Sequence, residues 1–186
     1  MKKSTLDKVY LKTIDLLNKE KLTYLIIGGL ATGVIGEARL TQDIDVLISI
    51  PQYKIKDFFS KAKKIGFSYS PKQVEEDIKL RGVFKLMLGD FHVDFIIAGM
   101  PFEQSAFSRK KKISLYNRVA YFPSPEDLIL FKIIASRPKD ILDIKAIVLR
   151  HRKRLDVTYL KKWARIISND LQNVKIYTLL ERLLKE

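Results

Sequence analysis

The spacing of hydrophobic positions changes several times along the chain, and each change predicts an element. Residues 4–21 place apolar side chains at helical intervals, which predicts an amphipathic helix. Continuous apolar runs at 23–27 and 43–50 predict two buried strands. Two alternating runs within residues 83–98 flank Gly89-Asp90, a turn dipeptide, and predict a β-hairpin. Together these patterns predict a small sheet with helices packed around it.

Shorter stretches complete the first two thirds of the chain. Residues 30–35 predict a short helix after a pair of glycines, and residues 53–65 predict a longer one. Residues 68–79 are polar and ambiguous, and we interpret their acidic run as a solvated segment. Residues 102–112 lead into a basic run, and residues 119–122 predict an edge strand.

The pattern becomes wholly helical after Pro123. Ser124 is an expected N-cap, Pro125 occupies the first helical position, and Glu126-Asp127 lies in the first turn. This helix is expected to stop before Pro138, and three more follow at about 138–150, after Asp156 and at about 171–184. The predicted fold class is therefore α/β (α+β): a small mixed sheet with flanking helices in residues 1–122, and a helical C-terminal region in residues 123–186.

Composition limits the environment of this domain. The chain has 186 residues, of which 47% are hydrophobic, so it can bury a full core. It has no cysteine, which excludes disulfide scaffolds and thiolate metal sites. The N-terminus lacks the apolar core of a signal peptide, and no apolar run approaches the ~20 residues that span a bilayer. We therefore expect a cytoplasmic protein without a membrane partner.

The formal net charge of +14 favours an acidic partner such as nucleic acid, a nucleotide or an anionic membrane. A lysine-rich surface that only keeps the protein soluble explains the charge equally well. Two basic runs stand out, Arg109–Lys112 and Arg150–Arg154. Tyr116 and Tyr121 lie near the first run, where bases could stack on them, although such runs are more often solvated loops.

The candidate chemistry begins at Gly28-Gly29, which ends the first predicted strand. After a spacer of thirteen residues, Asp43-Ile-Asp45 opens the second strand. Residues i and i+2 of a strand share a face, so Asp43 and Asp45 are expected side by side. Two adjacent carboxylates repel each other unless a cation lies between them, and their oxygens suit Mg²⁺. The glycine backbone, without a Cβ, allows its N–H groups to approach a phosphate at the following helix.

A third acid, Asp94, stands in the middle of an apolar strand in the predicted hairpin. A buried aspartate without a partner is rare, so it is a candidate site residue. The alternative is an aspartate paired with an arginine or capping a turn. His92 is expected on the same strand face, where it could tune the site, although a lone histidine is more often a packed or surface residue. The glycines do not fit a dinucleotide fingerprint or a phosphate-binding P-loop, whose further glycines and lysine are missing.

Gly28-Gly29, the spacer and Asp43-Ile-Asp45 resemble the signature of the polymerase-β-like nucleotidyltransferase superfamily. The segment from Arg39 to Asp45 resembles its minimal branch, which includes toxins of toxin–antitoxin pairs and antibiotic nucleotidyltransferases. Gly29 stands where the superfamily often has serine, a departure shared with CCA-adding enzymes.

The resemblance implies a metal-dependent enzyme that moves an NMP from an NTP to a hydroxyl acceptor and releases pyrophosphate. It implies that Mg²⁺ or Mn²⁺ binds at Asp43, Asp45 and Asp94, and that the Gly28-Gly29 amides hold phosphates. The segments 128–132 and 137–144 resemble a second motif of the minimal branch. There Lys132 would contact the triphosphate, with Asp140 and Asp143 nearby, so the C-terminal helices would complete the nucleotide site. If the resemblance is set aside, the residues alone predict that Lys132 is a surface lysine and that Asp140 stabilises the helix dipole. Asp143 is then expected to be half of an ion pair.

The acceptor stays open at this stage. The charge and the Arg150–Arg154 run favour RNA, such as a tRNA end, and disfavour a cationic aminoglycoside. A protein hydroxyl is another candidate, and the resemblance also implies an antitoxin as a candidate partner. The alternative function is a non-catalytic nucleotide- or RNA-binding protein with the same fold. The sequence specifies neither the NTP nor the oligomeric state.

Overall fold

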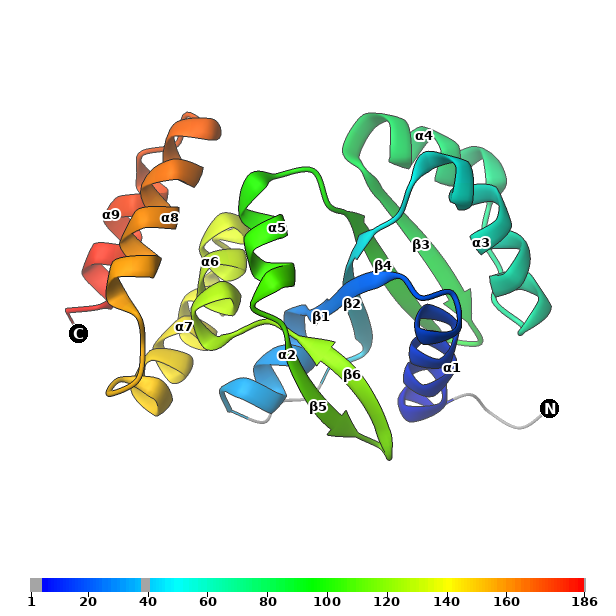
Figure 1. Cartoon of the computed structure of the whole chain (residues 1–186), viewed down its shortest axis with the longest axis horizontal. Coiled ribbons are helices and arrows are strands. Elements are labelled where there is room, and N and C mark those ends of the chain that lie inside the picture. The colour runs from blue at the N-terminus through cyan, green and yellow to red at the C-terminus, as the bar shows by residue number, and fades with distance from the viewer. Residues whose placement is uncertain (1–4, 38–40, 186) are drawn as a thin grey trace.

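The computed structural model describes residues 5–37 and 41–185 of the chain. Helices and strands alternate in the first two thirds of this part, and helices alone follow (Figure 1). Their order is α1 (Leu6–Lys19), β1 (Thr23–Ile27), α2 (Gly28–Ile35), β2 (Asp43–Ser49), α3 (Gln52–Lys64), α4 (Pro71–Arg81), β3 (Val83–Leu88), β4 (Phe91–Ile97), α5 (Pro101–Ser108), β5 (Lys111–Leu115), β6 (Arg118–Phe122), α6 (Pro125–Ala135), α7 (Pro138–His151), α8 (Val157–Asp170) and α9 (Lys175–Leu183).

Four strands form a mixed sheet in the order β1-β2-β4-β3. Strand β2 runs antiparallel to β1 and parallel to β4, and the predicted hairpin of β3 and β4 closes the sheet on the other side. The parallel pair is possible because α3, α4 and β3 lie between β2 and β4 in the chain and provide the crossover. The predicted fold class, a small mixed sheet with flanking helices, is confirmed.

Helix α3 packs on the outer half of the sheet through an aromatic cluster. The ring of Phe58 lies 6.0 Å from Phe84 of β3 and 5.6 Å from Phe95 of β4, and those two strand rings stack on each other. In Figure 1, α3 and α4 lie on the right and α6 to α9 on the left, with the sheet between them. Of the helices on the left, α6 and α7 pack against α2, the helix that follows β1.

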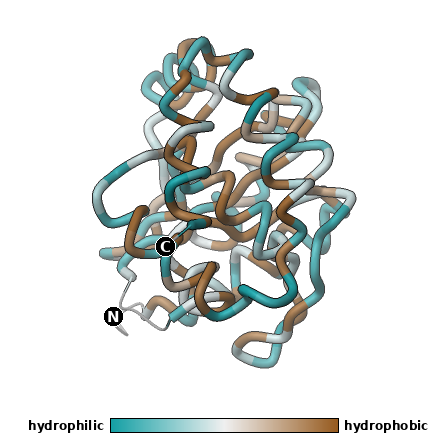
Figure 2. Tube along the Cα trace, turned by 90° about the vertical axis from the view of Figure 1, so that its left-hand side faces the viewer, coloured by the Kyte–Doolittle hydropathy of each residue, from teal (hydrophilic) through white to brown (hydrophobic). Residues whose placement is uncertain are grey.

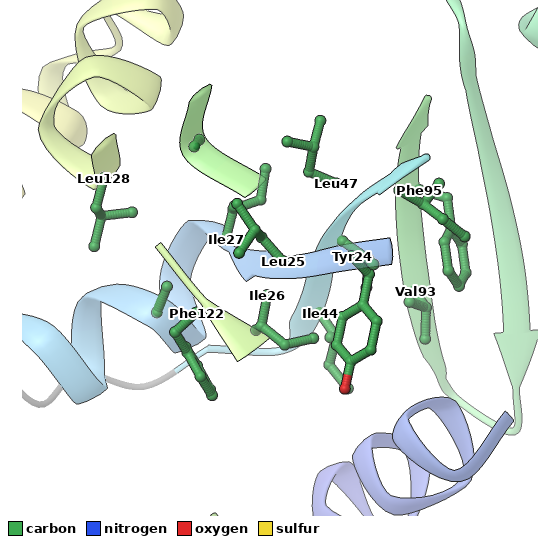
Figure 3. Close-up of a cluster of buried hydrophobic side chains, with 14 of the residues drawn as sticks. Tyr24, Leu25, Ile26, Ile27, Ile44, Leu47, Val93, Phe95, Phe122 and Leu128 are labelled. Carbon is green, nitrogen blue, oxygen red and sulfur yellow. The ribbon is translucent and has the colours of Figure 1, made fainter. Parts of the chain in front are cut away.

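The core passes without a break from the sheet into the C-terminal helices. Strands β5 and β6 form a separate two-stranded sheet, and Phe122 at the end of β6 is fully buried. Figure 3 shows Phe122 and Leu128 of α6 beside the buried side chains of β1, among them Ile26 and Ile27. The hydropathy trace in Figure 2 shows hydrophobic segments running through the interior, with hydrophilic positions concentrated on the outer turns.

The helix signals of the C-terminal region are confirmed. The Ser124 hydroxyl accepts a hydrogen bond from the Asp127 backbone N–H, with Pro125 as the first residue of α6. Asp156 caps α8 in the same way, through the backbone N–H of Tyr159. None of the helices in the described ranges combines the length and apolar character that crossing a membrane requires.

Two segments differ from the prediction. The ambiguous segment 68–79 forms most of α4, which Ser70 caps and which Gly82 ends with a left-handed backbone. The hydrophobic pattern did not reveal this helix because Val74 is its one buried residue. The basic run at 109–112 is only partly the solvated loop expected: Lys110–Lys112 are exposed, but Lys111 and Lys112 begin strand β5. Ser4, the predicted cap of the first helix, lies outside the described residues, and Thr5 occupies the N-cap of α1.

Candidate active site

The three predicted acids are brought together by the parallel pairing of β2 and β4. The register sets Asp45 opposite Asp94 and Asp43 opposite His92. Residues two apart on each strand share a face, so all four side chains project from one face of the sheet. No local pattern predicts the register of two strands whose paired residues are about fifty positions apart, so the pairing of His92 with Asp43 comes from the fold.

The turn from β1 into α2 is built around Asp45. Gly28 has a positive φ of 65°, and a Cβ at this position would lie 1.7 Å from Asp45 Oδ2. Any other residue would therefore displace the carboxylate. The backbone N–H of Gly29 donates a hydrogen bond to the same carboxylate. Helix α2 starts at Gly28 itself, two residues earlier than predicted, so its N-terminus faces the acids.

The acids repel one another electrostatically. Burial, followed by the negative charges of Asp43 and Asp94, raises the pKa of Asp45 from 3.8 to about 6. The hydrogen bond from Gly29 and the positive charge of Arg137 oppose this rise but do not cancel it. Asp43 receives a hydrogen bond from the Thr41 hydroxyl at 2.8 Å, which fixes its carboxylate. The fold thus holds like charges close together at an energetic cost.

Two nitrogen groups lie against Asp94. The Lys85 ammonium is 3.3 Å from Asp94 Oδ1, and His92 Nε2 is 3.4 Å from Asp94 Oδ2. One ligand atom from each of Asp43, His92 and Asp94 can be chosen so that all three lie within 4.8 Å of one another. These side chains are partly exposed, so solvent and ligands reach them.

Lys132, predicted to contact phosphate, has a buried amine in an ion-pair cluster. Its Nζ lies 2.6 Å from Asp143 Oδ2 and 3.3 Å from Asp140 Oδ1, and its side chain is 4% exposed. Helices α6 and α7 pack side by side, which brings these groups together. The interpretation of Lys132 as a surface lysine is therefore wrong, and the ion pair considered for Asp143 is present. Contact between Lys132 and a triphosphate stays a prediction.

Arg137 is a site residue for which the sequence suggested no role. Its guanidinium holds Asp140 through Nε at 2.7 Å and Nη2 at 3.3 Å, and its backbone N–H donates to the same carboxylate. Hydrogen bonding to Asp140, and then the charges of Asp140, Asp45 and Asp43, raise the pKa of Arg137 against the effect of burial. The side chain is 56% exposed, and its charge acts both on Asp140 and on the acids of the sheet. The available signal was the position of Arg137 directly before Pro138 at the start of a helix.

The two basic runs have different environments. Arg109 is partly buried, paired with Glu126 and Asp127, and its guanidinium lies over the ring of Tyr159. It therefore ties α5 to α6 and α8. In the second run, Arg150 donates to the backbone carbonyl of Gly36, and His151 Nε2 lies 2.8 Å from the Ile35 carbonyl. The following residues 152–154 are exposed.

Comparison with known proteins agrees with this geometry. Residues 6–181 match a family described as "nucleotidyltransferase of unknown function (DUF6036)". The lincosamide antibiotic adenylyltransferase LnuA is similar in structure, with a TM-score of 0.52, 16% identity, and coverage of 78% of this chain and 96% of that one. ANT(2")-Ia, solved with adenylyl-2"-tobramycin, has a TM-score of 0.55 and 16% identity, with 97% of each chain covered. A search of curated proteins found no match.

Proposed function

Since the chain belongs to the DUF6036 family of nucleotidyltransferases, we propose that it transfers an NMP from an NTP to a hydroxyl acceptor and releases pyrophosphate. The observation that carries this proposal is the convergence of Asp43, Asp45 and Asp94 on one face of β2 and β4. They lie beside the turn at Gly28-Gly29, where the Asp45 carboxylate packs directly against Gly28 at the N-terminus of α2.

The residues present fit a divalent cation. Burial and then the charges of Asp43 and Asp94 raise the pKa of Asp45, and a cation would remove the repulsion between these carboxylates. We propose Asp43, Asp45 and Asp94 as its ligands and Mg²⁺ or Mn²⁺ as the ion. When bound, such an ion would lower the pKa of the acceptor hydroxyl and neutralise charge on the triphosphate.

The side chains have separate tasks in the proposed reaction. The acceptor oxygen attacks the α-phosphorus of the NTP, and the bond from that phosphorus to the β-phosphate oxygen breaks, so pyrophosphate leaves. Asp94, the acid farthest from the Gly28-Gly29 turn in the strand order, is placed to accept the hydroxyl proton. The N-terminus of α2, at Gly28 and Gly29, favours the negative charge of the phosphates.

We propose Arg137 as the direct phosphate contact of α7. Its exposed guanidinium interacts with the charges of Asp43 and Asp45 yet is fixed at its base by Asp140. Asp140 is in turn fixed by Lys132. In this arrangement Lys132 is a positioning residue that acts through Asp140. The alternative is direct contact between Lys132 and the triphosphate. For that contact, the Lys132 amine would have to leave Asp140 and Asp143. Variants of Lys132 distinguish the two roles.

RNA is the acceptor that the charge distribution favours. Helix α7 carries Arg137 at its start and the exposed segment 152–154 after its end. That end is bonded to the last carbonyls of α2, whose first residue is Gly28. Because α2 has eight residues, it is about 12 Å long. An RNA bound along residues 152–154 would therefore need to extend only a few nucleotides to place a terminal hydroxyl at the acids.

A small antibiotic is the second candidate acceptor, suggested by what LnuA and ANT(2")-Ia bind. The net charge of +14 opposes a polycationic aminoglycoside such as tobramycin. The similarity to those two structures shows a shared fold, and their binding partners belong to them. RNA is therefore the acceptor that we propose to test first.

The test is incubation of the protein with each labelled NTP, Mg²⁺ or Mn²⁺, and total RNA, tRNA, lysate protein or antibiotics. We expect label in RNA and release of pyrophosphate. RNA affinity should fall with salt by about 0.7–0.9 log units per log unit of salt for each neutralised phosphate. Label in protein or antibiotic with none in RNA would overturn the proposed acceptor, and no label anywhere would support the non-catalytic alternative.

A matched pair of charge reversals locates the RNA surface. Arg152, Lys153 and Arg154 changed together to Glu should weaken RNA binding and leave NTP affinity unchanged. Lys54, Lys63 and Lys64 are exposed on α3, across the sheet in Figure 1, and the same change there alters the net charge equally. Equal loss of RNA binding in both variants would indicate a general charge effect and not a binding surface.

A further inference from the structure

We infer that His92 is a nitrogen ligand of the divalent cation in this site, and that the site consequently binds Mn²⁺ in preference to Mg²⁺. The inference rests on the proposed function, because it concerns the same cation. It goes beyond the three aspartates by assigning a different type of ligand atom and therefore a preference among metals.

The geometry places the imidazole among the acids. His92 lies opposite Asp43 in the parallel pairing and two residues before Asp94 on the same face. Ligand atoms of Asp43, His92 and Asp94 lie within 4.8 Å of one another. Around an ion with bonds of about 2.1 Å, ligand atoms are separated by roughly 3–4 Å. Small side-chain rotations would bring the three groups onto one ion.

Other roles explain His92 less well. Its side chain is 29% exposed, so it does not fill the core. Its Nε2 lies 3.4 Å from Asp94 Oδ2, beyond the ~2.7–2.9 Å of a charge-assisted hydrogen bond. Asp94 already has a cationic neighbour in Lys85. The imidazole is therefore not needed to compensate Asp94, and it stands where a cation would bridge the two carboxylates.

The ligand type determines the metal preference. Mg²⁺ binds oxygen almost exclusively and keeps water in the remaining positions, whereas imidazole nitrogen suits transition metals. Adding one imidazole to the carboxylate ligands therefore favours Mn²⁺ more than the carboxylates alone would. Lys85 does not prevent binding, because its side chain is 51% exposed and can turn into solvent when a cation arrives.

The experiment is pulsed EPR of the full chain with bound Mn²⁺, with and without a non-hydrolysable ATP analogue. A coordinated imidazole gives a nitrogen modulation, which changes when the protein is labelled with ¹⁵N-histidine. The chain has two histidines, so the signal can be assigned by mutation. His151 is the matched control, since its Nε2 contacts the Ile35 backbone carbonyl and not the acids.

We expect the nitrogen modulation in the wild type and in His151→Gln, and its loss in His92→Gln. Calorimetric titration of His92→Gln should show Mn²⁺ affinity reduced by about tenfold or more and Mg²⁺ affinity reduced by less than about threefold. Circular dichroism checks that the variants are folded.

The possible results distinguish a failure of the role of His92 from a failure of the proposed function. Bound Mn²⁺ that is lost in Asp43→Asn but shows no histidine modulation in the wild type would overturn the role of His92 and leave the proposed function standing. A modulation that persists in His92→Gln would also overturn it. Failure of the wild type to bind Mn²⁺ at all, with or without the nucleotide analogue, would overturn both.

Discussion

The acids of the sheet and the ion-pair cluster of the helices both gather charged side chains, but they balance them differently. At β2 and β4, Asp94 lies against Lys85, and the charge of Arg137 acts on Asp43 and Asp45, but the acids themselves are direct neighbours. Between α6 and α7, each aspartate bonds directly to a cation: Lys132 contacts Asp140 and Asp143, and Arg137 contacts Asp140.

The pKa values of Asp140 and Asp45 reflect this difference in neighbouring charges. Asp140 is fully buried, and despite that burial its pKa is lowered, because Arg137 and Lys132 bond to it. Asp45 is partly buried, and its pKa is raised, first by that burial and then by the charges of its acidic neighbours. A balanced cluster stabilises its own arrangement, whereas an unbalanced one costs stability until a ligand supplies the missing charge. The predictions below test this difference between a binding site and a structural support.

The largest effect is expected from Asp43→Ala or Asp45→Ala. Each removes a ligand of the proposed cation, so nucleotidyl transfer should fall by about a thousandfold or more. The melting temperature of the metal-free protein should not fall, because the variant loses a repulsive charge. Transfer assays and thermal unfolding with a chelator check both parts. Near-wild-type transfer in either variant would show that these acids do not carry the reaction.

Asp94→Asn tests whether the third acid serves the reaction or the fold, again by comparing transfer with thermal stability. The amide keeps the shape of the carboxylate but is a poor metal ligand and a poor base, so activity should drop far more than stability. Transfer measured at low temperature beside a melting curve distinguishes the two. A variant that melts early and stays active in the cold would make Asp94 structural.

Lys132→Met should reduce stability as well as transfer, because it removes the buried cation that contacts both Asp140 and Asp143. We expect the free energy of unfolding to fall by about 3–5 kcal/mol and transfer to fall roughly a hundredfold, while metal still binds at the sheet. Lys132→Met combined with Asp143→Asn should recover part of the stability. Recovered stability without recovered activity would favour direct contact between Lys132 and the triphosphate.

Arg137→Gln tests whether the exposed guanidinium of the ion-pair cluster binds the NTP, separately from the stability that the buried part provides. If the guanidinium contacts phosphate, KM for the NTP should rise about tenfold, worth ~1.4 kcal/mol. Stability should change by less than about 1 kcal/mol, because the side chain is 56% exposed. Arg137→Lys, which keeps the charge but not the paired donors, should restore KM only partly. Steady-state kinetics with varied NTP provide the measurement.

The smallest effect is a pH dependence at Asp45. Its pKa is about 6 in the folded protein and 3.8 ordinarily. The folded state therefore binds the proton more tightly, and stability is lost as pH rises through about 6. Asp45→Asn is neutral throughout, so without metal it should melt higher than the wild type at pH 8 and not at pH 4. Equal differences at both pH values would contradict a raised pKa.

Local patterns of the sequence were sufficient for many elements of the fold. Ser124 before Pro125 marked the start of α6, and Gly89-Asp90 marked the turn of the β3–β4 hairpin. These signals are local because a cap or a turn is satisfied within four residues of itself. Helix α4 escaped the same analysis because it rests on the sheet mainly through Val74 and has almost no apolar stripe to detect.

The sequence by itself determined that two carboxylates share a strand face, because that depends only on the alternation of side chains. It also placed Asp94 on an apolar strand as the candidate third acid. The tertiary structure decided which strands pair and in which register, and so set His92 beside Asp43. It also decided that the Lys132 amine meets Asp140 and Asp143 in the interior and that Arg137 faces the acids. Those neighbours come from distant parts of the chain or from the packing of α6 against α7, and no local pattern records them, since long-range contacts depend on how the whole core packs.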